Sequence, residues 1–311
     1  MLNNVRLRRT LGVASCVSML AGCATPQPIF LKANTPPVVA PVTPSQRDLL
    51  YIPPPAQPVP VAVYSFADQT GQTKPETTQS LSRAVTQGGT SVLIKALRDA
   101  GNGGWFSVVE RERLDNLLRE RQIIREMRRT YLGETETPAA ILPSLMFAGV
   151  ILEGGIISFD SNVETGGVGA RFLGIGGSVQ YRTNTATVYL RAVSVKTGEV
   201  LANVVTQKNV SSIGAEGGAF RYVKYDELLE AEAGYTSNEP SQIAVQAATE
   251  KAVYALIMEG ARPGPRQLWS FADPVAGQAW LSRYDEDRGR SLDAVARRDG
   301  GPPGPPAAAK H

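Results

Sequence analysis

Hydrophobic residues recur with two different periods in the middle of the chain, between residues 59 and 260. Short apolar segments rich in β-branched residues predict strands, and longer segments with apolar residues three or four positions apart predict helices. Because the two kinds of segment interleave, we predict a compact α/β sandwich. The predicted strands are 59–66, 105–109, 148–159, 185–195 and 200–206, and the predicted helices are 80–100, 111–129 and 240–259.

Two segments inside this domain, about 160–183 and about 207–236, have a pattern that a soluble core does not need. Apolar residues there alternate with glycine or charged residues, which fits strands with lipid on one face and water on the other. Each arm approaches the ~9–11 residues that a tilted membrane-crossing strand requires. The residues that carry the pattern are Val168, Ala170, Arg171, Phe172, Phe220, Tyr222, Leu229, Ala231, Ala233 and Tyr235.

Each of these segments also has a simpler interpretation. A glycine-rich stretch such as 166–169 can be a flexible loop, and an alternating strand can belong to a soluble sheet. A phosphate-binding loop is disfavoured, because the glycines do not follow the G-x-G-x-x-G spacing and no Gly-Lys-Ser/Thr motif comes after them.

If both segments cross the membrane as hairpins, one chain supplies only four strands. Closed outer-membrane barrels begin at ~8 strands, and an open sheet edge in lipid leaves backbone groups unpaired at a cost of several kcal/mol each. The chain must then close a barrel with copies of itself. The predicted fold is therefore an α/β periplasmic domain with two transmembrane β-hairpins per protomer, which co-assemble into one large oligomeric β-barrel.

The N-terminal residues have the layout of a bacterial lipoprotein precursor. Three arginines precede an apolar run, 11–22, whose length fits a signal peptide and is too short to span a bilayer. The run ends in Leu-Ala-Gly-Cys23, which resembles the lipobox at which such precursors are cleaved. We predict a signal peptide over 1–22, a covalent lipid on Cys23, and sorting to the outer membrane, because alanine rather than aspartate follows the cysteine. An ordinary secretory signal with a chance cysteine is the alternative.

The sequences that flank the predicted domain at 59–260 are rich in proline. A stretch of proline, threonine and alanine over 23–58 predicts an extended tether between the lipid and the domain. After the domain we predict a helical extension over 261–299. Glycines and prolines then lead into an alanine-rich tail, 300–311, which we predict to be disordered.

The charge balance argues against binding to nucleic acid. The precursor has 32 Lys and Arg against 29 Asp and Glu, and the three arginines of the predicted signal peptide account for the excess. A mature chain without net charge lacks the electrostatic character of a nucleic-acid-binding protein. Arginines are frequent in 111–129, but acidic residues interleave with them, which is typical of a solvated or subunit-facing helix.

The sequence contains few residues of the types that catalysis and metal binding most often use, with two cysteines and one histidine. Cys16 leaves with the signal peptide and Cys23 carries lipid, so the mature chain has no thiol for a disulfide or a metal. The only histidine is His311, the last residue, which argues against a Ser-His or Cys-His dyad. We predict a protein that is not an enzyme and that has no cofactor apart from the covalent lipid.

Five stretches carry a resemblance to a known family. They read VY at 63–64, DQTGQTKP at 68–75, LDNLLRER at 114–121, SNVETGGVGARF at 161–172 and GYTSNEP at 234–240. Together they resemble the CsgG family of curli secretion channels over most of the predicted domain. The resemblance implies a homo-oligomeric ring of nine protomers, a nonamer, with two membrane hairpins from each. The ring would stand in the outer membrane with its soluble domains in the periplasm.

The resemblance also implies a function. In this family unfolded amyloid subunits diffuse from the periplasm to the cell surface through an ungated channel, without a nucleotide or a proton gradient. The implied partners are secreted fibre or adhesin subunits, periplasmic or surface accessory factors, and outer-membrane lipid. The long proline-rich tether and the C-terminal tail resemble the holdfast-anchoring HfaB branch, so curli-type and holdfast-type export both stay open.

One part of the sequence departs from the family pattern. The family's channel is narrowed, after the first strand, by a tyrosine, an asparagine and a phenylalanine from each protomer, and the matching positions here are Glu76, Ser80 and Leu81. A ring of Glu76 carboxylates would make the constriction negative and perturb its own ionisation. The alternative is that these residues begin a helix without a role in a pore. The competing function is a lipid-tethered scaffold that forms no channel.

Overall fold

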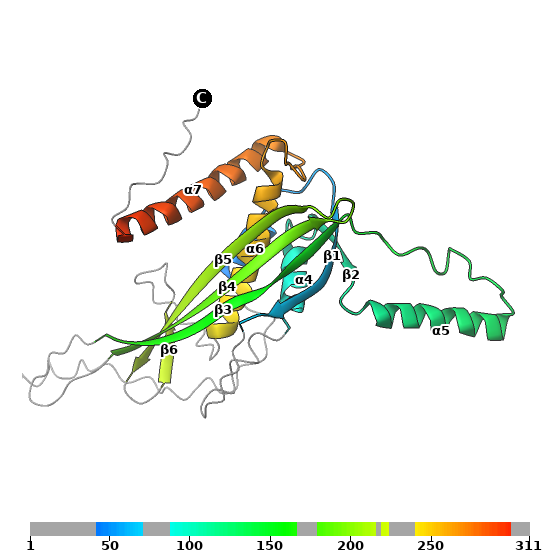
Figure 1. Ribbon diagram of the computed structural model, residues 1–311, viewed down its shortest axis with the longest axis horizontal. Coiled ribbons are helices and arrows are strands. Elements are labelled where there is room, and N and C mark those ends of the chain that lie inside the picture. The colour runs from blue at the N-terminus through cyan, green and yellow to red at the C-terminus, as the bar shows by residue number, and fades with distance from the viewer. Residues whose placement is uncertain (1–41, 71–87, 167–178, 216–218, 224–239, 300–311) are drawn as a thin grey trace, which may run out of the picture. The chain divides into compact units, whose positions relative to one another are not determined.

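A computed structural model describes residues 42–70, 88–166, 179–215, 219–223 and 240–299 (Figure 1). Helices and strands alternate along most of this chain. The helices are α2 (Pro44–Leu50), α4 (Gly89–Asp99), α5 (Leu114–Leu132), α6 (Pro240–Ala261) and α7 (Pro274–Asp299), and the strands are β1 (Val59–Asp68), β2 (Phe106–Glu110), β3 (Val150–Gly166), β4 (Val179–Ser194), β5 (Val200–Ala215) and β6 (Ala219–Val223).

A six-stranded mixed sheet forms the centre of the described chain, with the strand order β2-β1-β3-β4-β5-β6. β1 runs parallel to both of its neighbours, with Val61 opposite Val108 on β2 and Val150 on β3. From β3 to β6 each strand is antiparallel to the next. The prediction of interleaved strands and helices in one mixed α/β domain is confirmed.

Helices α4 and α6 pack against one face of this sheet, and α2 packs against both helices (Figure 1). β4 shows how the sequence produces this layer. Its residues Ala186, Val188, Leu190 and Ala192 are buried, and the residues between them are not. Since successive side chains of a strand point to opposite faces, this alternation buries one face and leaves the other wet. None of the described helices combines the length and the apolar character that crossing a membrane would require.

The structure corrects the predicted extended tether over 23–58. Its first part lies outside the described residues, but from residue 42 on the chain is folded. α2 begins at Pro44, and the side chains of Leu49 and Ile52 are almost completely buried in the core. The prolines of this stretch therefore mark the start of a helix and its turns rather than an unfolded linker.

Capping explains why α2 begins where it does. The Thr43 hydroxyl accepts a hydrogen bond from the backbone N–H of Gln46 at 3.0 Å. Proline suits the next position, because the first N–H groups of a helix have no partner within it. The spacing of threonine and glutamine matches the capping-box pattern, a signal for a helix start that the sequence analysis did not use.

Several other bounds differ from those predicted. The helix predicted over 111–129 is displaced by three residues and forms α5. β3, β4 and β5 are longer than predicted, because they continue into both segments assigned to hairpins. In the segment predicted as a helix over 80–100, α4 begins only at Gly89, and 80–87 lies outside the described residues.

Candidate functional site

Most residues predicted to carry the function lie outside the described residues. β6 contains Phe220 and Tyr222. What the structure describes is the support of the predicted site, namely the strands that lead into the hairpins and both ends of segment 71–87. The predicted residues outside the described part are Cys23, Glu76, Ser80, Leu81, Val168, Ala170, Arg171, Phe172, Leu229, Ala231, Ala233 and Tyr235.

Three long strands run without interruption from the helix-covered sheet into both predicted hairpins. β3 has 17 residues, and β4 and β5 have 16 each. β3 and β4 pair as far as Gly166 and Val179, with one shift of register between Ile156 and Ser158. β4 and β5 pair as far as Gln180 and Gly214. β6 joins β5 at this same end of the sheet. The four strands therefore continue beyond the region where β1 and β2 complete the sheet.

We call this region the sheet extension: β3 from Ser158, β4 up to Thr187, β5 from Gln207, and β6. Among the described residues, both of its edges lack a neighbouring strand. β1 accompanies β3 only as far as Ile156, so the outer part of β3 pairs with β4 alone. On the other side β6 pairs with β5 alone. Backbone N–H and C=O groups at such edges can pair with another chain.

The first end of segment 71–87 is attached to the sheet through Gln69. Its backbone N–H donates a hydrogen bond to the carbonyl of Ile156 at 2.8 Å, which prolongs the pairing of β1 with β3. Its side-chain Nε2 donates to the Tyr189 hydroxyl on β4 at 3.0 Å. Two strands therefore hold the residue at which β1 gives way to this segment.

The second end of segment 71–87 is attached to the same part of β1. Thr90 lies in the first turn of α4, and its buried hydroxyl accepts a hydrogen bond from the Phe66 N–H at 3.1 Å. Gly89 lies so close that a Cβ atom there would be 2.8 Å from Cδ1 of Phe66. Gly88 has a φ angle of 83°, which glycine adopts without strain. These residues fix where the chain returns to the domain.

On the face of the sheet opposite α4 and α6, β4 presents polar side chains. Arg191 on β4 donates from Nε to the Glu153 carboxylate on β3 at 3.0 Å, and this hydrogen bond raises the pKa of the Arg191 guanidinium. The positions of β4 between its buried residues are occupied by Thr183, Thr185, Thr187, Tyr189 and Arg191. Hydroxyl groups and a paired charge suit a face that stays in contact with water.

Helix α5 differs from the other helices with described side chains in having no buried residue. Ile123, Met127 and Tyr131 are four positions apart, so they form one stripe along the helix. Their exposed fractions are 47%, 52% and 73%. In the loop that follows, Phe147 is 85% exposed. We call the three helix residues the α5 stripe; a contiguous exposed apolar surface of this kind is typical of a protein contact.

Charged residues of α5 pair with one another and with the following loop. Arg128 donates to the Glu134 carboxylate from Nε at 2.7 Å and from Nη2 at 2.6 Å, and this pairing lowers the pKa of Glu134. Arg129 donates to Glu126 at 2.9 Å. These ion pairs neutralise part of the positive charge of α5.

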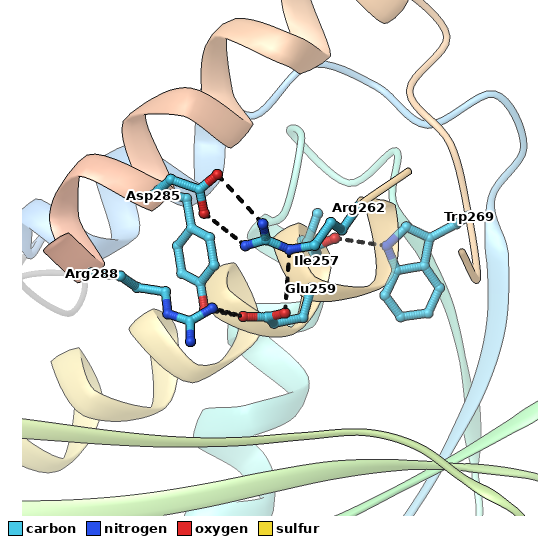
Figure 2. Close-up of polar contacts among 7 residues, drawn as sticks. Ile257, Glu259, Arg262, Trp269, Asp285 and Arg288 are labelled. Atoms are coloured by element: carbon cyan, nitrogen blue, oxygen red, sulfur yellow. Dashed lines mark hydrogen bonds and ion pairs between the residues drawn. The ribbon is translucent and has the colours of Figure 1, made fainter. Parts of the chain in front are cut away.

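Helix α7 is joined to the end of α6 by a cluster of charged residues (Figure 2). Arg262 lies between Asp285, with a nitrogen–oxygen distance of 2.7 Å, and Glu259, at 3.6 Å. Glu259 also accepts hydrogen bonds from Arg288 at 2.8 Å and from the Tyr284 hydroxyl at 2.9 Å. Burial is the main reason why the pKa of Tyr284 is raised. The cluster orients α7 on α6.

Beneath this cluster Trp269 fills the core at the end of α6. Its Nε1 donates to the carbonyl of Ile257 at 2.8 Å (Figure 2). Its ring packs edge-on against Trp105 and Phe106, with centroids 6.4 and 6.1 Å apart. Gly260 allows this approach, because a Cβ atom there would lie 2.2 Å from the indole. The start of the segment predicted as an extension, 261–299, is therefore part of the core.

A buried carboxylate connects α6 with the start of α2. Glu250 is 2% exposed and accepts hydrogen bonds from the Thr43 hydroxyl and, at 2.8 Å, from Nε2 of Gln246. Burial raises the pKa of Glu250, and the two hydrogen bonds offset part of this effect. Arg283 of α7 also contacts Asp48 of α2, at 3.1 Å. Helix α2 and its cap residue Thr43 are therefore held to both α6 and α7.

Sequence reasoning missed these fastenings, because nothing in the local pattern couples residues about two hundred positions apart. The hydrogen bonds and ion pairs described above hold the helices to one another. The edges of the sheet extension and the α5 stripe, in contrast, suit contact with other chains.

Comparison with known proteins identifies the family. The family model described as "Curli production assembly/transport component CsgG" matches residues 43–273. The protein of that name from Salmonella typhimurium (strain LT2) is 41% identical over 259 residues, which cover 83% of this chain and 90% of the relative. Its counterpart from Escherichia coli (strain K12) is 40% identical over 264 residues, or 84% of this chain and 91% of the relative. The chain therefore belongs to the CsgG family, which consists of transport components, and the prediction that it is not an enzyme is confirmed.

Proposed function

We propose that the chain is an outer-membrane lipoprotein that assembles with copies of itself into a channel, through which unfolded fibre or adhesin subunits leave the cell. The observation that carries the proposal is the pair of open edges on the sheet extension. If β6 of one copy pairs with the outer part of β3 on the next, both edges are used at once. Repeating this head-to-tail contact closes a ring when the rotation fits.

Membrane physics supports the same arrangement. In lipid every backbone polar group must find a partner within the protein, so strands can cross only as part of a closed sheet. The outer part of β3, from Ser158 to Gly166, has nine residues, close to the ~9–11 that a tilted crossing strand requires. A barrel shared by several copies would be wide and filled with water.

The names of the family relatives suggest the cargo. They are named as curli production assembly/transport components, so the proposed cargo is an unfolded fibre subunit of the curli or the holdfast type. A nonamer, anchored by lipid on Cys23 and served by accessory factors of the periplasm or the surface, extends the proposal by family resemblance. Glu76, Ser80 and Leu81 would form the constriction.

The α5 stripe supports contact between copies at the level of the soluble domain. Its side chains are exposed to water although they are apolar, and covering them in an assembly would gain roughly 25 cal/mol for each Å² removed from water. Contacts between subunits bury such surfaces, which are uncommon on proteins that stay monomeric.

Two measurements test the proposal. Detergent-extracted, lipidated protein should form rings in electron micrographs viewed down the axis, and the same particles should conduct ions in planar bilayers. Replacing Glu76→Gln should reduce the preference for cations without changing the ring, because the constriction loses its negative charges. Glu134→Gln, at a carboxylate beside α5, is the matched control and should leave selectivity unchanged. A monomeric protein that does not conduct would leave only the lipid-tethered scaffold.

A further inference from the structure

A β-bulge on β3 changes the direction of its side chains where the sheet extension begins. Ile156 stands opposite the buried Val188 on β4, whereas Ser158 stands opposite the adjacent residue, Thr187. Ile157 is therefore one extra residue on β3. Because successive side chains of a strand point to opposite faces, an extra residue exchanges the two faces of the strand beyond it.

The bulge turns Asp160 away from the helices. With regular alternation Asp160 would continue the buried row that contains Leu152 and Ile156. Instead Phe159 is buried, with 7% of its surface exposed, and Asp160 is exposed. The bulge therefore places a carboxylate on the face of the sheet opposite α4 and α6.

The other described side chains of the sheet extension on this face are neutral and polar. They stand opposite one another across β3, β4 and β5. Apart from Ser158 and Asp160, they are Thr183, Thr185, Thr187, Gln207, Asn209 and Ser211. The nearby Lys208 stands opposite the buried Ala186 and therefore belongs to the other face.

The charge of Asp160 is not neutralised by a described basic side chain. Its Oδ2 accepts a hydrogen bond from the Ser158 hydroxyl at 3.0 Å, which leaves the negative charge in place. Glu153, further back on the same face of β3, differs because it forms an ion pair with Arg191. Among the described side chains, Asp160 therefore gives this face of the sheet extension its net charge.

We propose that Asp160 lines the conduit of the channel and makes it favour cations and the basic segments of a transiting chain. The inference rests on the proposed function, in which the sheet extension forms part of the barrel wall. In such a wall the polar face meets water and the apolar face meets lipid, which places Asp160 inside. Each copy in a ring adds one carboxylate at the same height, and charges of one sign attract counter-ions.

Salt should control the effect, because a carboxylate on the wall of a wide conduit acts through water. The Debye length is ~30 Å at about 0.01 M salt and ~3 Å at about 1 M. Asp160→Asn keeps the shape of the side chain and removes its charge. We expect it to lower the ratio of potassium to chloride permeability about twofold at the lower salt concentration and to leave it unchanged at the higher one.

The experiment measures reversal potentials of the full-length lipidated protein in planar bilayers. Asp160→Cys introduces a thiol into a chain whose other cysteines are Cys16, in the predicted signal peptide, and Cys23, the predicted site of the lipid. A negatively charged thiol reagent should restore the permeability ratio, and a positively charged one should lower it further. A purely structural role of Asp160 would not respond to the sign of the reagent. Glu199→Gln, at an exposed carboxylate between β4 and β5, is the matched control and should change nothing.

Model chains test the preference for basic segments. A lysine-rich unfolded peptide, added on the side of the soluble domains at low salt, should enter the Asp160→Asn channel about twofold less often than the unmodified one. A glutamate-rich peptide of the same length should enter it more often. Equal entry rates in the two proteins would overturn the proposed preference.

The possible failures are distinguishable. If the unmodified protein does not conduct, the proposed function fails and the inference fails with it. If it conducts, an unchanged permeability ratio in Asp160→Asn at low salt overturns the inference while the channel stands. A thiol at position 160 that does not react, or an equal change in Glu199→Gln, overturns it as well. Should Asp160→Asn form no ring, the comparison of the two reagents on Asp160→Cys decides.

Discussion

Strand β3 belongs both to the part of the sheet around β1 and to the sheet extension. The two regions differ in how many neighbouring strands β3 has there. Near Leu152 and Ile156, β3 has a strand on each side and helices on one face, and both side chains are completely buried. From Ser158 onward the same strand has β4 on one side and, among the described residues, no strand on the other.

This difference separates what the chain completes alone from what it leaves to other molecules. In the first region the apolar side chains are covered, and β1 and β3 each have a strand on both sides. The sheet extension has edges at which another strand can pair, and the α5 stripe exposes apolar side chains that another molecule can cover. Stability of the monomer and assembly should therefore respond to different substitutions.

The largest effect is expected on assembly. Replacing Ile123→Glu and Met127→Glu places two charges in the α5 stripe, which should abolish ring formation because buried charges without partners are costly. The free energy of unfolding of the monomer should change by no more than about 0.5 kcal/mol, as for other exposed sites. Size-exclusion chromatography with light scattering gives the first quantity, and urea denaturation gives the second.

Leu118→Glu is the control for this double variant. Leu118 is 47% exposed, like Ile123, but lies five positions before it and therefore off the stripe. Rings that survive the double variant, or that Leu118→Glu disrupts equally, would show that the α5 stripe is not part of the contact.

The next largest effect is expected on stability. Trp269→Ala should lower the free energy of unfolding by about 3–5 kcal/mol, because a buried indole is lost and a cavity remains. Val205→Ala, at a valine of β5 that is 60% exposed, should change it by less than about 0.5 kcal/mol. Denaturant unfolding followed by circular dichroism measures both. Similar losses for the two variants would contradict the division between a covered core and a wet sheet face.

Much of the covered region could be predicted from the sequence, because its periods are set by burial. The β-branched residues of 185–195 predicted a strand, and the structure has Leu190 buried and Tyr189 turned to the other face. The apolar positions of 240–259 predicted α6 nearly to its last residue. These elements are local patterns that a single periodic rule describes.

The missed features depend on contacts across long distances in sequence. Thr43 was assigned to a tether because of the prolines around it, and its partner Glu250 lies 207 residues away. The bond between Gln69 and Tyr189 spans 120 residues. No period or motif couples such pairs, since each depends on how the sheet and the helices are stacked.

The smallest effect is expected on the pH dependence of stability, and it concerns the fastening of α2. Burial raises the pKa of Glu250 in the folded state above its ordinary value of 4.5. The folded protein therefore binds this proton more tightly than the unfolded chain, so the contribution of Glu250 is fully present below about pH 4.5 and is lost as the pH rises through the folded-state pKa. Each pKa unit between the two states corresponds to ~1.4 kcal/mol.

Glu250→Gln should remove this contribution, so its free energy of unfolding should fall less steeply with rising pH than that of the unmodified protein. Thr43→Val should make this fall with pH steeper. In the unmodified protein the Thr43 hydroxyl donates to the Glu250 carboxylate and lowers its pKa, so removing the hydroxyl raises that pKa further. The substitution should also cost about 1 kcal/mol at every pH through loss of the cap on α2. Urea denaturation between pH 4 and 8 separates slope from offset. Parallel profiles for all three proteins would mean that the Glu250 carboxylate contributes nothing to holding α2 in place.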